Sequence, residues 1–301
     1  MPSIVDEIRE ACAWVAERAG HVRIDEQAVP DYAAGLPLKP GLDGADPDAH
    51  LQAGSREQRA AFWLTLDAIN FGSGWFPTLR KRPGHSGYLT VAAGLKDHGP
   101  WSAEELRRID AAEIANALGQ DPGHELMALF AASLNDLGEH VHGESFAGVV
   151  DSAHGSAVAL AQRLSGWRCF ADASTYDGRT VPFLKRAQIA AADLHRAGVG
   201  EFHDLRRLTM FADNLVPHVL RLDGVLAFAP DLAARIERGE LIEHGSREEV
   251  EIRACALHAV ELIVAERPDS RAADIDELLW LRGQQPRYKR SPRHRSRTTA
   301  Y

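Results

Sequence analysis

Apolar residues recur at three- and four-residue spacing through most of the chain, which is the pattern of helices with one buried face. In residues 3–19, Ser3 can cap a helix whose apolar positions are Ile4, Ile8, Ala11, Cys12 and Val15. The same spacing predicts helices over 55–69, 111–118, 125–137, 153–164, 183–197, 231–237, 247–266 and 272–282. Capping boxes are predicted for the pairs Ser102 with Glu105 and Ser246 with Glu249. The pattern therefore predicts an all-α protein with at most a few short strands.

Four segments depart from helical spacing. Residues 22–29 predict a short strand or an extended segment, residues 88–95 predict a second short strand, and residues 176–178 predict a turn. Residues 30–47 contain four prolines and predict a long irregular loop. Neither an internal repeat of fixed period nor a clear linker divides the chain, so residues 1–285 are expected to form a single compact helical domain.

Composition changes this picture little. Hydrophobic residues make up 45% of the 301 and charged residues 26%, which is ordinary for a soluble globular protein. The net charge of −9 argues against duplex nucleic acid as a direct partner, because phosphate contacts need clustered Lys and Arg. The absence of a bilayer-length apolar run and the acidic, amphipathic N-terminus favour a cytosolic protein without a membrane partner. Cys12, Cys169 and Cys255 are widely spaced and are expected to be reduced core residues.

Residues 286–301 are the exception to the acidic balance. This segment lacks hydrophobic periodicity and carries the cations Arg287, Lys289, Arg290, Arg293, Arg295 and Arg297. Such a composition predicts a solvated, disordered C-terminal tail rather than a binding site.

Common catalytic motifs are missing from the sequence. It contains no Walker loop, no GxGxxG after a strand, no GxSxG elbow and no HExxH. The His203–Asp204 dipeptide leaves a metal-dependent all-α phosphohydrolase as an alternative, because imidazole and carboxylate together suit a divalent cation. The other nearby histidines, His140, His142 and His154, do not fall into a regular ligand spacing.

Asp213 is a carboxylate with unusual surroundings. It lies within LTMFADNLVPHVLR, between an apolar run and Pro217, in a segment that should be largely buried. A buried carboxylate needs compensating partners. The residue can serve as a helix cap, with Pro217 in the first helical turn, or as a functional group.

A few other residues combine charge or aromatic surface with a suggestive position. Trp75, in GSGWFP, offers a flat surface for a planar ligand or for loop packing. Asp276 and Glu277 precede Trp280 on a predicted helix. Hydrophobic surroundings of this kind can shift the pKa of a carboxylate for catalysis, but both residues can equally be exposed on the helix surface. Lys185 lies in the first turn of a predicted helix, where a cation opposes the helix dipole and a nearby anion would favour it.

Five strings together resemble the queuosine salvage proteins, the queuosine 5′-phosphate N-glycosylase/hydrolases. They run in order over nearly the whole chain: DAINFGSGWFPTL (67–79), FLKRAQIAAADL (183–194), LTMFADNLVPHVL (208–220), GSREEVEIRACALHAVE (245–261) and IDELLW (275–280). The resemblance implies an all-α hydrolase whose active region is similar to that of helix-hairpin-helix DNA glycosylases. Its implied substrate is queuosine 5′-monophosphate and its product is queuine, with no cofactor and no metal.

The resemblance also assigns roles to residues of this chain. The family's catalytic carboxylate falls on Asp213, a base-contacting aromatic on Phe211 and a ligand-binding histidine on His50. In the last helix Asp276 matches the family pattern, whereas Glu277 replaces an aromatic and Leu281 replaces a second Asp.

The implied chemistry defines the remaining expectations. A carboxylate beneath the anomeric carbon would stabilise the developing ribose cation, orient or deprotonate water, or attack the sugar. Asp276 and Glu277 are expected to hold the base, Trp75 to stack on it together with Phe211, and Lys185 to contact the phosphate. A protein that binds a modified nucleoside without cleaving it is a further alternative.

Overall fold

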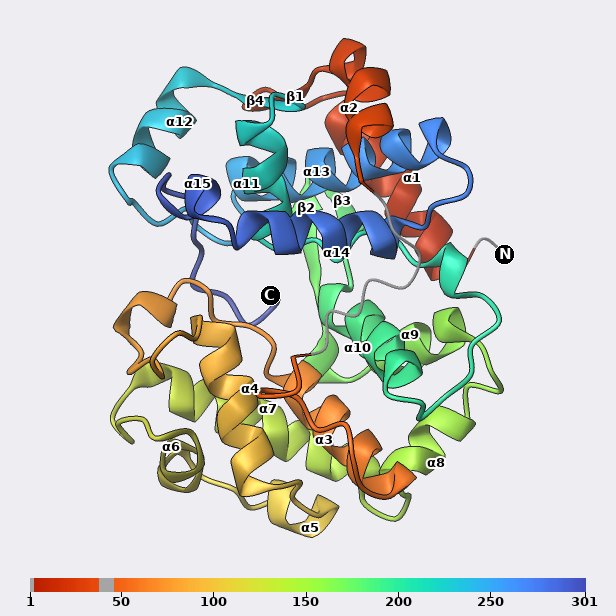
Figure 1. Ribbon diagram of the computed structural model, residues 1–301, viewed down its shortest axis with the longest axis vertical. Helices are drawn as coiled ribbons and strands as arrows, with labels where there is room; N and C mark the ends of the chain where they lie inside the picture. Colours follow the sequence, from red (N-terminus) through yellow and green to blue (C-terminus); the bar gives the residue numbers. More distant parts are fainter. Residues whose placement is uncertain (1–2, 38–45) are drawn as a thin grey trace.

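The computed structural model describes residues 3–37 and 46–301, and these form two halves (Figure 1). The terminal half unites the two ends of the sequence: α1 (Ile4–Ala16), β1 (Val22–Ile24), α2 (Val29–Gly35), α11 (Leu215–Leu222), β4 (Leu226–Phe228), α12 (Pro230–Glu237), α13 (Arg247–Glu266), α14 (Ala272–Gly283) and α15 (Pro286–Lys289). The central half contains α3 (Arg56–Ala68), α4 (Gly87–His98), α5 (Ala103–Leu106), α6 (Ala111–Leu118), α7 (Glu125–Val141), α8 (Phe146–Asp151), α9 (Ala157–Ser165) and α10 (Lys185–Arg196). The predicted all-α class is confirmed.

Helix α13 is the centre of the terminal half. Buried residues occur on all sides of this helix, and it packs against α1, α2, α11 and α14. A helix buried all round forms the middle of a bundle rather than its surface. Buried apolar residues of both halves belong to one continuous cluster, so the halves share a core.

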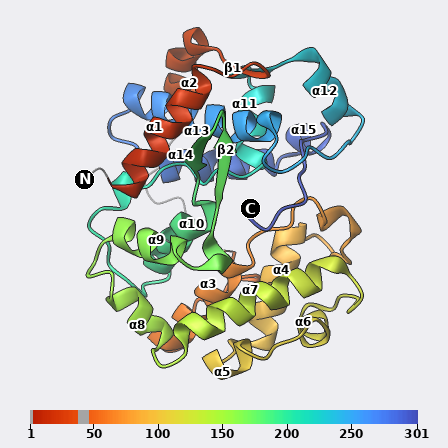
Figure 2. The same cartoon turned by 180° about the vertical axis from the view of Figure 1, so that it is seen from behind.

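Two small antiparallel sheets complete the fold. The hairpin of β2 (Ala173–Tyr176) and β3 (Arg179–Pro182) runs between the halves, as the view from behind shows (Figure 2). Its turn residues Asp177 and Gly178 both have positive φ, 46° and 77°, which is the geometry of a tight hairpin turn and confirms the predicted turn. Strand β1 pairs with β4, which confirms an extended segment at residues 22–24.

Some sequence-based boundaries are wrong. Residues 88–95 are not a strand but part of α4, whose N-cap Ser86 accepts a hydrogen bond from the Leu89 backbone N–H. The helix expected over 153–164 begins only at Ala157, as α9, because His154 and Gly155 have positive φ and separate it from α8. The expected loop at 30–47 begins as α2, and residues 38–45 of that loop lie outside the described residues.

The prediction of a disordered tail over residues 286–301 is also wrong. This segment, which we call the C-terminal arm, runs between the halves after α15. Alternate residues point inward, and the buried set comprises His294, Ser296, Thr298, Ala300 and Tyr301. The arm is held by backbone bonds from Ile242 N to Arg295 O (2.9 Å) and from Gly72 N to Tyr301 O (3.2 Å). An extended chain with inward polar residues satisfies the hydrogen-bonding groups of its backbone through such contacts. Its sequence shows no hydrophobic periodicity from which this structure could be predicted.

All three cysteines are buried free thiols. Among the described helices, none combines the length and apolar character required to cross a bilayer.

Candidate active site

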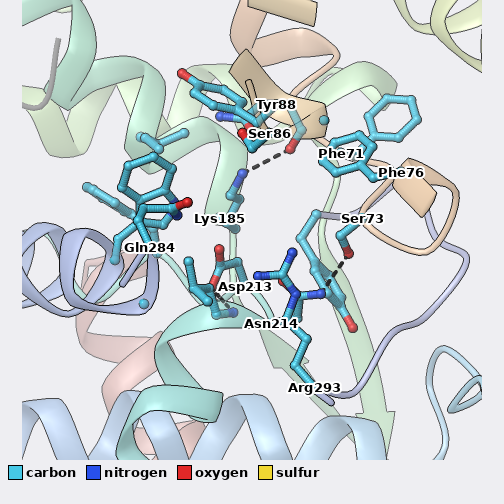
Figure 3. Close-up of a pocket in the computed structure, with 18 of the residues that line it drawn as sticks. Phe71, Ser73, Phe76, Ser86, Tyr88, Lys185, Asp213, Asn214, Gln284 and Arg293 are labelled. Carbon is cyan, nitrogen blue, oxygen red and sulfur yellow. Dashed lines mark hydrogen bonds between the residues drawn. The ribbon is translucent and has the colours of Figure 1, made fainter. Parts of the chain in front are cut away.

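A cavity of about 470 Å³ lies where the two halves meet. Its lining includes one face of α10 along its whole length, the segment 211–215, α14, the loop before α4 and the C-terminal arm. Figure 3 shows Asp213 near the middle of this cavity, between Lys185 and Arg293. Segments that are far apart in sequence therefore converge on one carboxylate.

Asp213 caps α11 and also lines the cavity. Its Oδ1 accepts hydrogen bonds from the backbone N–H groups of Leu215 (2.7 Å) and Val216 (3.2 Å). None of the described residues donates a hydrogen bond to Oδ2, and the side chain is only half-buried. The predicted capping role is confirmed, and it leaves the second oxygen available to a ligand.

The turn that carries Asp213 is fixed on both sides. Before it, Arg253 Nε donates to the Ala212 carbonyl (3.0 Å) and the Phe211 N–H donates to Asp276 Oδ1 (3.0 Å). After it, the side-chain amide of Asn214 donates to the carbonyl of His294 in the C-terminal arm (3.2 Å). Bonds from three separate elements hold the carboxylate in one position, which is what preorganised electrostatic stabilisation requires.

Lys185 reaches the base of the cavity from the first turn of α10. Its backbone N–H donates to Asp172 Oδ2 (2.9 Å), and its Nζ donates to the Asn70 carbonyl (2.9 Å), a bond drawn in Figure 3. Burial lowers the pKa of Lys185 to about 8, although the carboxylates of Asp213 and Asp67 act in the opposite direction. The amine is therefore a cation surrounded by acidic groups rather than by open phosphate-binding surface.

Asp276 lies on α14 and is buried at the cavity wall. Burial, and then the charge of Asp213, raises the pKa of Asp276 well above its usual range. These surroundings favour the protonated form of the carboxyl group, which can donate a hydrogen bond, whereas Oδ1 accepts one from the Phe211 N–H. Glu277, the next residue, also lines the cavity and lies 3.4 Å from the Arg196 guanidinium.

His50 is buried in the cavity wall beside Trp63, with ring centroids 5.0 Å apart. Burial lowers the pKa of His50 to about 4, so the ring is neutral. Its Nδ1 accepts the backbone N–H of Asp46 (2.8 Å), which assigns the ring proton to Nε2 and makes Nε2 the donor to Tyr88 Oη (3.0 Å). The Tyr88 hydroxyl then keeps its own hydrogen for another acceptor at the cavity wall.

The two aromatic predictions have different placements. Phe211 is buried and lines the cavity. Trp75 does not line it, because its indole N–H donates to Glu125 (2.8 Å) and its ring is covered by Arg297 of the C-terminal arm. The neighbouring Phe76 lines the cavity instead (Figure 3).

Sequence reasoning does not single out Tyr88 or Arg293, which also line the cavity. Ser86, an N-cap residue just before Tyr88, is a usable sign of the helix that carries this tyrosine. Arg293 lies in a run of similar cations, and nothing in the local pattern distinguishes it from its neighbours.

The His203–Asp204 dipeptide has a structural explanation. Asp204 accepts hydrogen bonds from the Ser156 hydroxyl and the Ala157 N–H, both at 2.6 Å, and so caps α9. Within residues 3–37 and 46–301, no group of three His, Cys, Asp or Glu side chains has an arrangement that could hold a metal ion.

Comparison with known proteins adds a family to this geometry. The family model described as "Queuosine salvage protein" matches residues 49–301. The queuosine 5′-phosphate N-glycosylase/hydrolase of Sphaerobacter thermophilus is 36% identical, with 95% of each chain covered. The proteins with this name from Dictyostelium discoideum and Mus musculus are 30% and 31% identical, over 98% and 97% of this chain and 98% of each relative. The resemblance seen in the five sequence strings is confirmed, and the chain belongs to the queuosine salvage protein family.

Proposed function

We propose that the protein hydrolyses the N-glycosidic bond of queuosine 5′-monophosphate and releases queuine for reuse in tRNA modification. One observation carries the proposal: Asp213 is fixed through Oδ1, whereas its Oδ2 is available to a ligand in a cavity of about 470 Å³. Cavities of this size suit small-molecule ligands such as nucleotides. The named activity of the relatives supports the choice of substrate.

The role of Asp213 follows from the charge that the reaction creates. As the bond from ribose C1′ to the base lengthens, positive charge develops on the sugar, and a carboxylate beneath C1′ lowers the energy of that state. The same oxygen can orient or deprotonate the water that adds to C1′, or attack C1′ directly before water replaces it. In each case C1′ gains a hydroxyl group from water and the base leaves with a proton.

Queuine is a 7-deazapurine and lacks the ring nitrogen at which ordinary purines are protonated during cleavage. Help for the departing base must therefore come from another edge of the ring. Asp276 can donate a hydrogen bond there in its protonated form, which burial and the charge of Asp213 favour by raising its pKa. Phe211 stacks on the base, and Glu277 and His50, the latter through Tyr88, bind its polar groups.

The cellular setting is part of the same proposal. The substrate is a small nucleotide, and the acidic net charge of −9 supports a protein that does not bind tRNA directly. We also infer a cytosolic location, supported by the three buried free cysteines.

The test is incubation of the protein with queuosine 5′-monophosphate, with queuosine and with ordinary purine nucleotides, reading free base. Wild type should release queuine and leave the ordinary purines intact. Asp213→Asn keeps an oxygen that can cap α11 but removes the charge, so release should fall by roughly 100-fold or more while the fold is retained.

Three results would redirect the proposal. Near-normal turnover by a folded Asp213→Asn variant would remove Asp213 from the chemistry. Activity abolished by a chelator and restored by a divalent cation would favour the phosphohydrolase alternative. Binding of queuine with no turnover of its nucleotide would favour a binding protein.

A further inference from the structure

Arg293 is an unusual cation in the cavity wall. The residue is half-buried, but its Nε atom is fully shielded from solvent without a hydrogen-bond partner. Across the described part of the chain, no hydrogen bond or ion pair engages any atom of its guanidinium group. Figure 3 shows the guanidinium pointing into the cavity beside Asp213 and Asn214.

Other cations near the cavity are already engaged or solvated. Lys185 donates to the Asn70 carbonyl, and Arg196 is paired with Asp193 at 2.6 Å. Arg297 on the same arm reaches Glu125 at 3.4 Å, whereas Lys81 and Lys289 are exposed at the cavity edge. Arg295 also lines the cavity, but none of its side-chain nitrogens is both shielded from solvent and without a partner. Among the described cations of the lining, Arg293 therefore combines a buried nitrogen with unused donors.

A guanidinium group in this position is costly unless an anion joins it. Burial lowers the pKa of Arg293, and the neighbouring carboxylate that opposes this effect is Asp213. Asp213 is turned toward α11 through Oδ1, so it does not form a hydrogen-bonded ion pair with Arg293. The planar group keeps its paired N–H donors, which match two oxygens of a phosphate.

A second donor lies on the same side of the cavity. The Ser73 hydroxyl accepts a hydrogen bond from the Asn214 side chain at 3.0 Å, shown as a dashed line in Figure 3. Because this oxygen is used as an acceptor, its own hydrogen is available to an incoming oxygen atom. Ser73 and Arg293 both line the cavity, and in Figure 3 both lie to the right of Asp213, whereas Lys185 lies above it.

The surroundings of Lys185 are less suitable for a dianion. Asp213, Asp67 and Asp276 all act on the charge of Lys185, and added negative charge there would be repelled. A nucleotide with its C1′ over Asp213 Oδ2 can instead direct its base toward Asp276 and its 5′ end toward Arg293.

We propose that Arg293 and the Ser73 hydroxyl bind the 5′-phosphate of the substrate, and that the C-terminal arm thereby sets the preference for nucleotide over nucleoside. This inference rests on the proposed function, but it predicts phosphate binding that can be measured without turnover. It moves the phosphate site from Lys185, the residue expected from the sequence, to a segment expected to be a solvated tail.

The main test compares Arg293→Gln with wild type on queuosine 5′-monophosphate and on queuosine. Loss of a paired, charge-assisted contact should lower kcat/KM for the nucleotide by roughly 10- to 100-fold, mainly through KM. Cleavage of the nucleoside should change by less than about twofold, because only the phosphate contact is lost.

Arg290→Gln is the matched control, since Arg290 is an exposed arginine of the same arm outside the cavity lining. Arg293→Lys should recover part of the lost kcat/KM for the nucleotide, because lysine keeps the positive charge but lacks the paired N–H donors of the guanidinium group.

Binding of ribose 5-phosphate, measured by calorimetry against ribose, provides a readout that needs no cleavage. Wild type and Arg290→Gln should bind the phosphate ester more tightly than ribose, whereas Arg293→Gln should lose that difference. An equal loss of activity on nucleotide and nucleoside would overturn the proposal and assign Arg293 to the Asp213 turn. Unchanged ribose 5-phosphate binding by a folded Arg293→Gln variant would overturn it too. If wild type binds ribose 5-phosphate but cleaves neither substrate, the proposed function fails while the phosphate site stands.

Discussion

The backbone N–H of Phe211 donates a hydrogen bond to Oδ1 of Asp276 at 3.0 Å. This contact joins the turn before Asp213 to α14, so that the proposed catalytic carboxylate and the carboxyl group of Asp276 are held in a fixed relation to each other. Because Asp276 accepts a main-chain hydrogen bond and is also buried, its protonation state affects both the fold and the cavity.

Replacing Asp276 with Asn should reduce the loss of stability at higher pH. Burial and Asp213 raise the pKa of Asp276, so between its unfolded and folded pKa values the native state binds more protons than the unfolded chain. Stability is then full below the unfolded pKa and decreases as pH rises through that window. An amide keeps an acceptor for the Phe211 N–H but cannot ionise. Denaturant unfolding from about pH 4 to about pH 8 measures the difference, with the exposed Asp269→Asn as control. Parallel pH curves for wild type and Asp276→Asn would contradict this account.

Replacing His50 with Gln should weaken acid destabilisation. Burial lowers the pKa of His50 to about 4, from 6.5 in the unfolded chain. Stability from the neutral ring is present above the unfolded pKa and is lost as pH falls toward 4, with an upper limit of about 3 kcal/mol. Free energies of unfolding from about pH 7 to about pH 4 test this, and His203→Gln, at an exposed position, should follow wild type. A His50→Gln variant as acid-sensitive as wild type would show that the buried ring is not responsible.

Replacing Arg253 with Met should destabilise the protein and disturb the Asp213 turn. Arg253 is fully buried and donates to the Ala212 carbonyl and to Asp172 at 2.7 Å. Its loss leaves the Asp172 carboxylate buried without its cation, which costs about 3–5 kcal/mol. The double variant Arg253→Met with Asp172→Asn should regain part of that free energy, as measured by denaturant unfolding. A double variant no more stable than the single one would show that the ion pair is not the source of the loss.

Replacing Gly74 with Ala should displace the C-terminal arm. A Cβ atom at this position would lie 2.4 Å from the backbone carbonyl oxygen of Ser296, closer than packed atoms allow. The variant should lose about 1–3 kcal/mol of stability and part of its activity, because the arm carries Arg293. Thermal unfolding together with queuine release measures both effects. Gly20→Ala, where a Cβ meets nothing within 4 Å, is the matched control, and equal behaviour of the two variants would argue against the clash.

The helices were the most predictable part of the fold. Helices over 111–118 and 247–266 have the predicted bounds, because amphipathic spacing and serine or aspartate caps agree at their starts. The strand prediction for residues 88–95 is wrong. The aromatic and β-branched residues of this segment favour a strand locally, whereas the Ser86 cap and packing against α3 and α6 favour a helix.

The site was predictable only in part. The apolar setting of Asp213 identifies it as a candidate site residue. In the structure its Oδ1 caps α11, and its Oδ2 is available to a ligand in the cavity. Trp75 has the same composition cue as Phe76, but Glu125, 50 residues away, determines where the indole points. The sequence of the C-terminal arm does not indicate that the arm is ordered, because its inward residues are mostly polar and their partners lie in distant segments. Contacts of this kind depend on topology rather than on local spacing.

The packing of α1 on α13 determines the order in which the chain can fold during synthesis. Arg9 on α1 pairs with Glu261 on α13 at 2.9 Å, across 252 residues of sequence. The central half is continuous, so its helices can pack as they leave the ribosome, whereas α1 must wait for a partner made near the end of translation. Until then the apolar face of α1, with Val5, Ile8 and Val15, lacks its main partner helix and is open to chaperones or to aggregation. Assembly of the cavity is accordingly a late event in the life of the nascent chain.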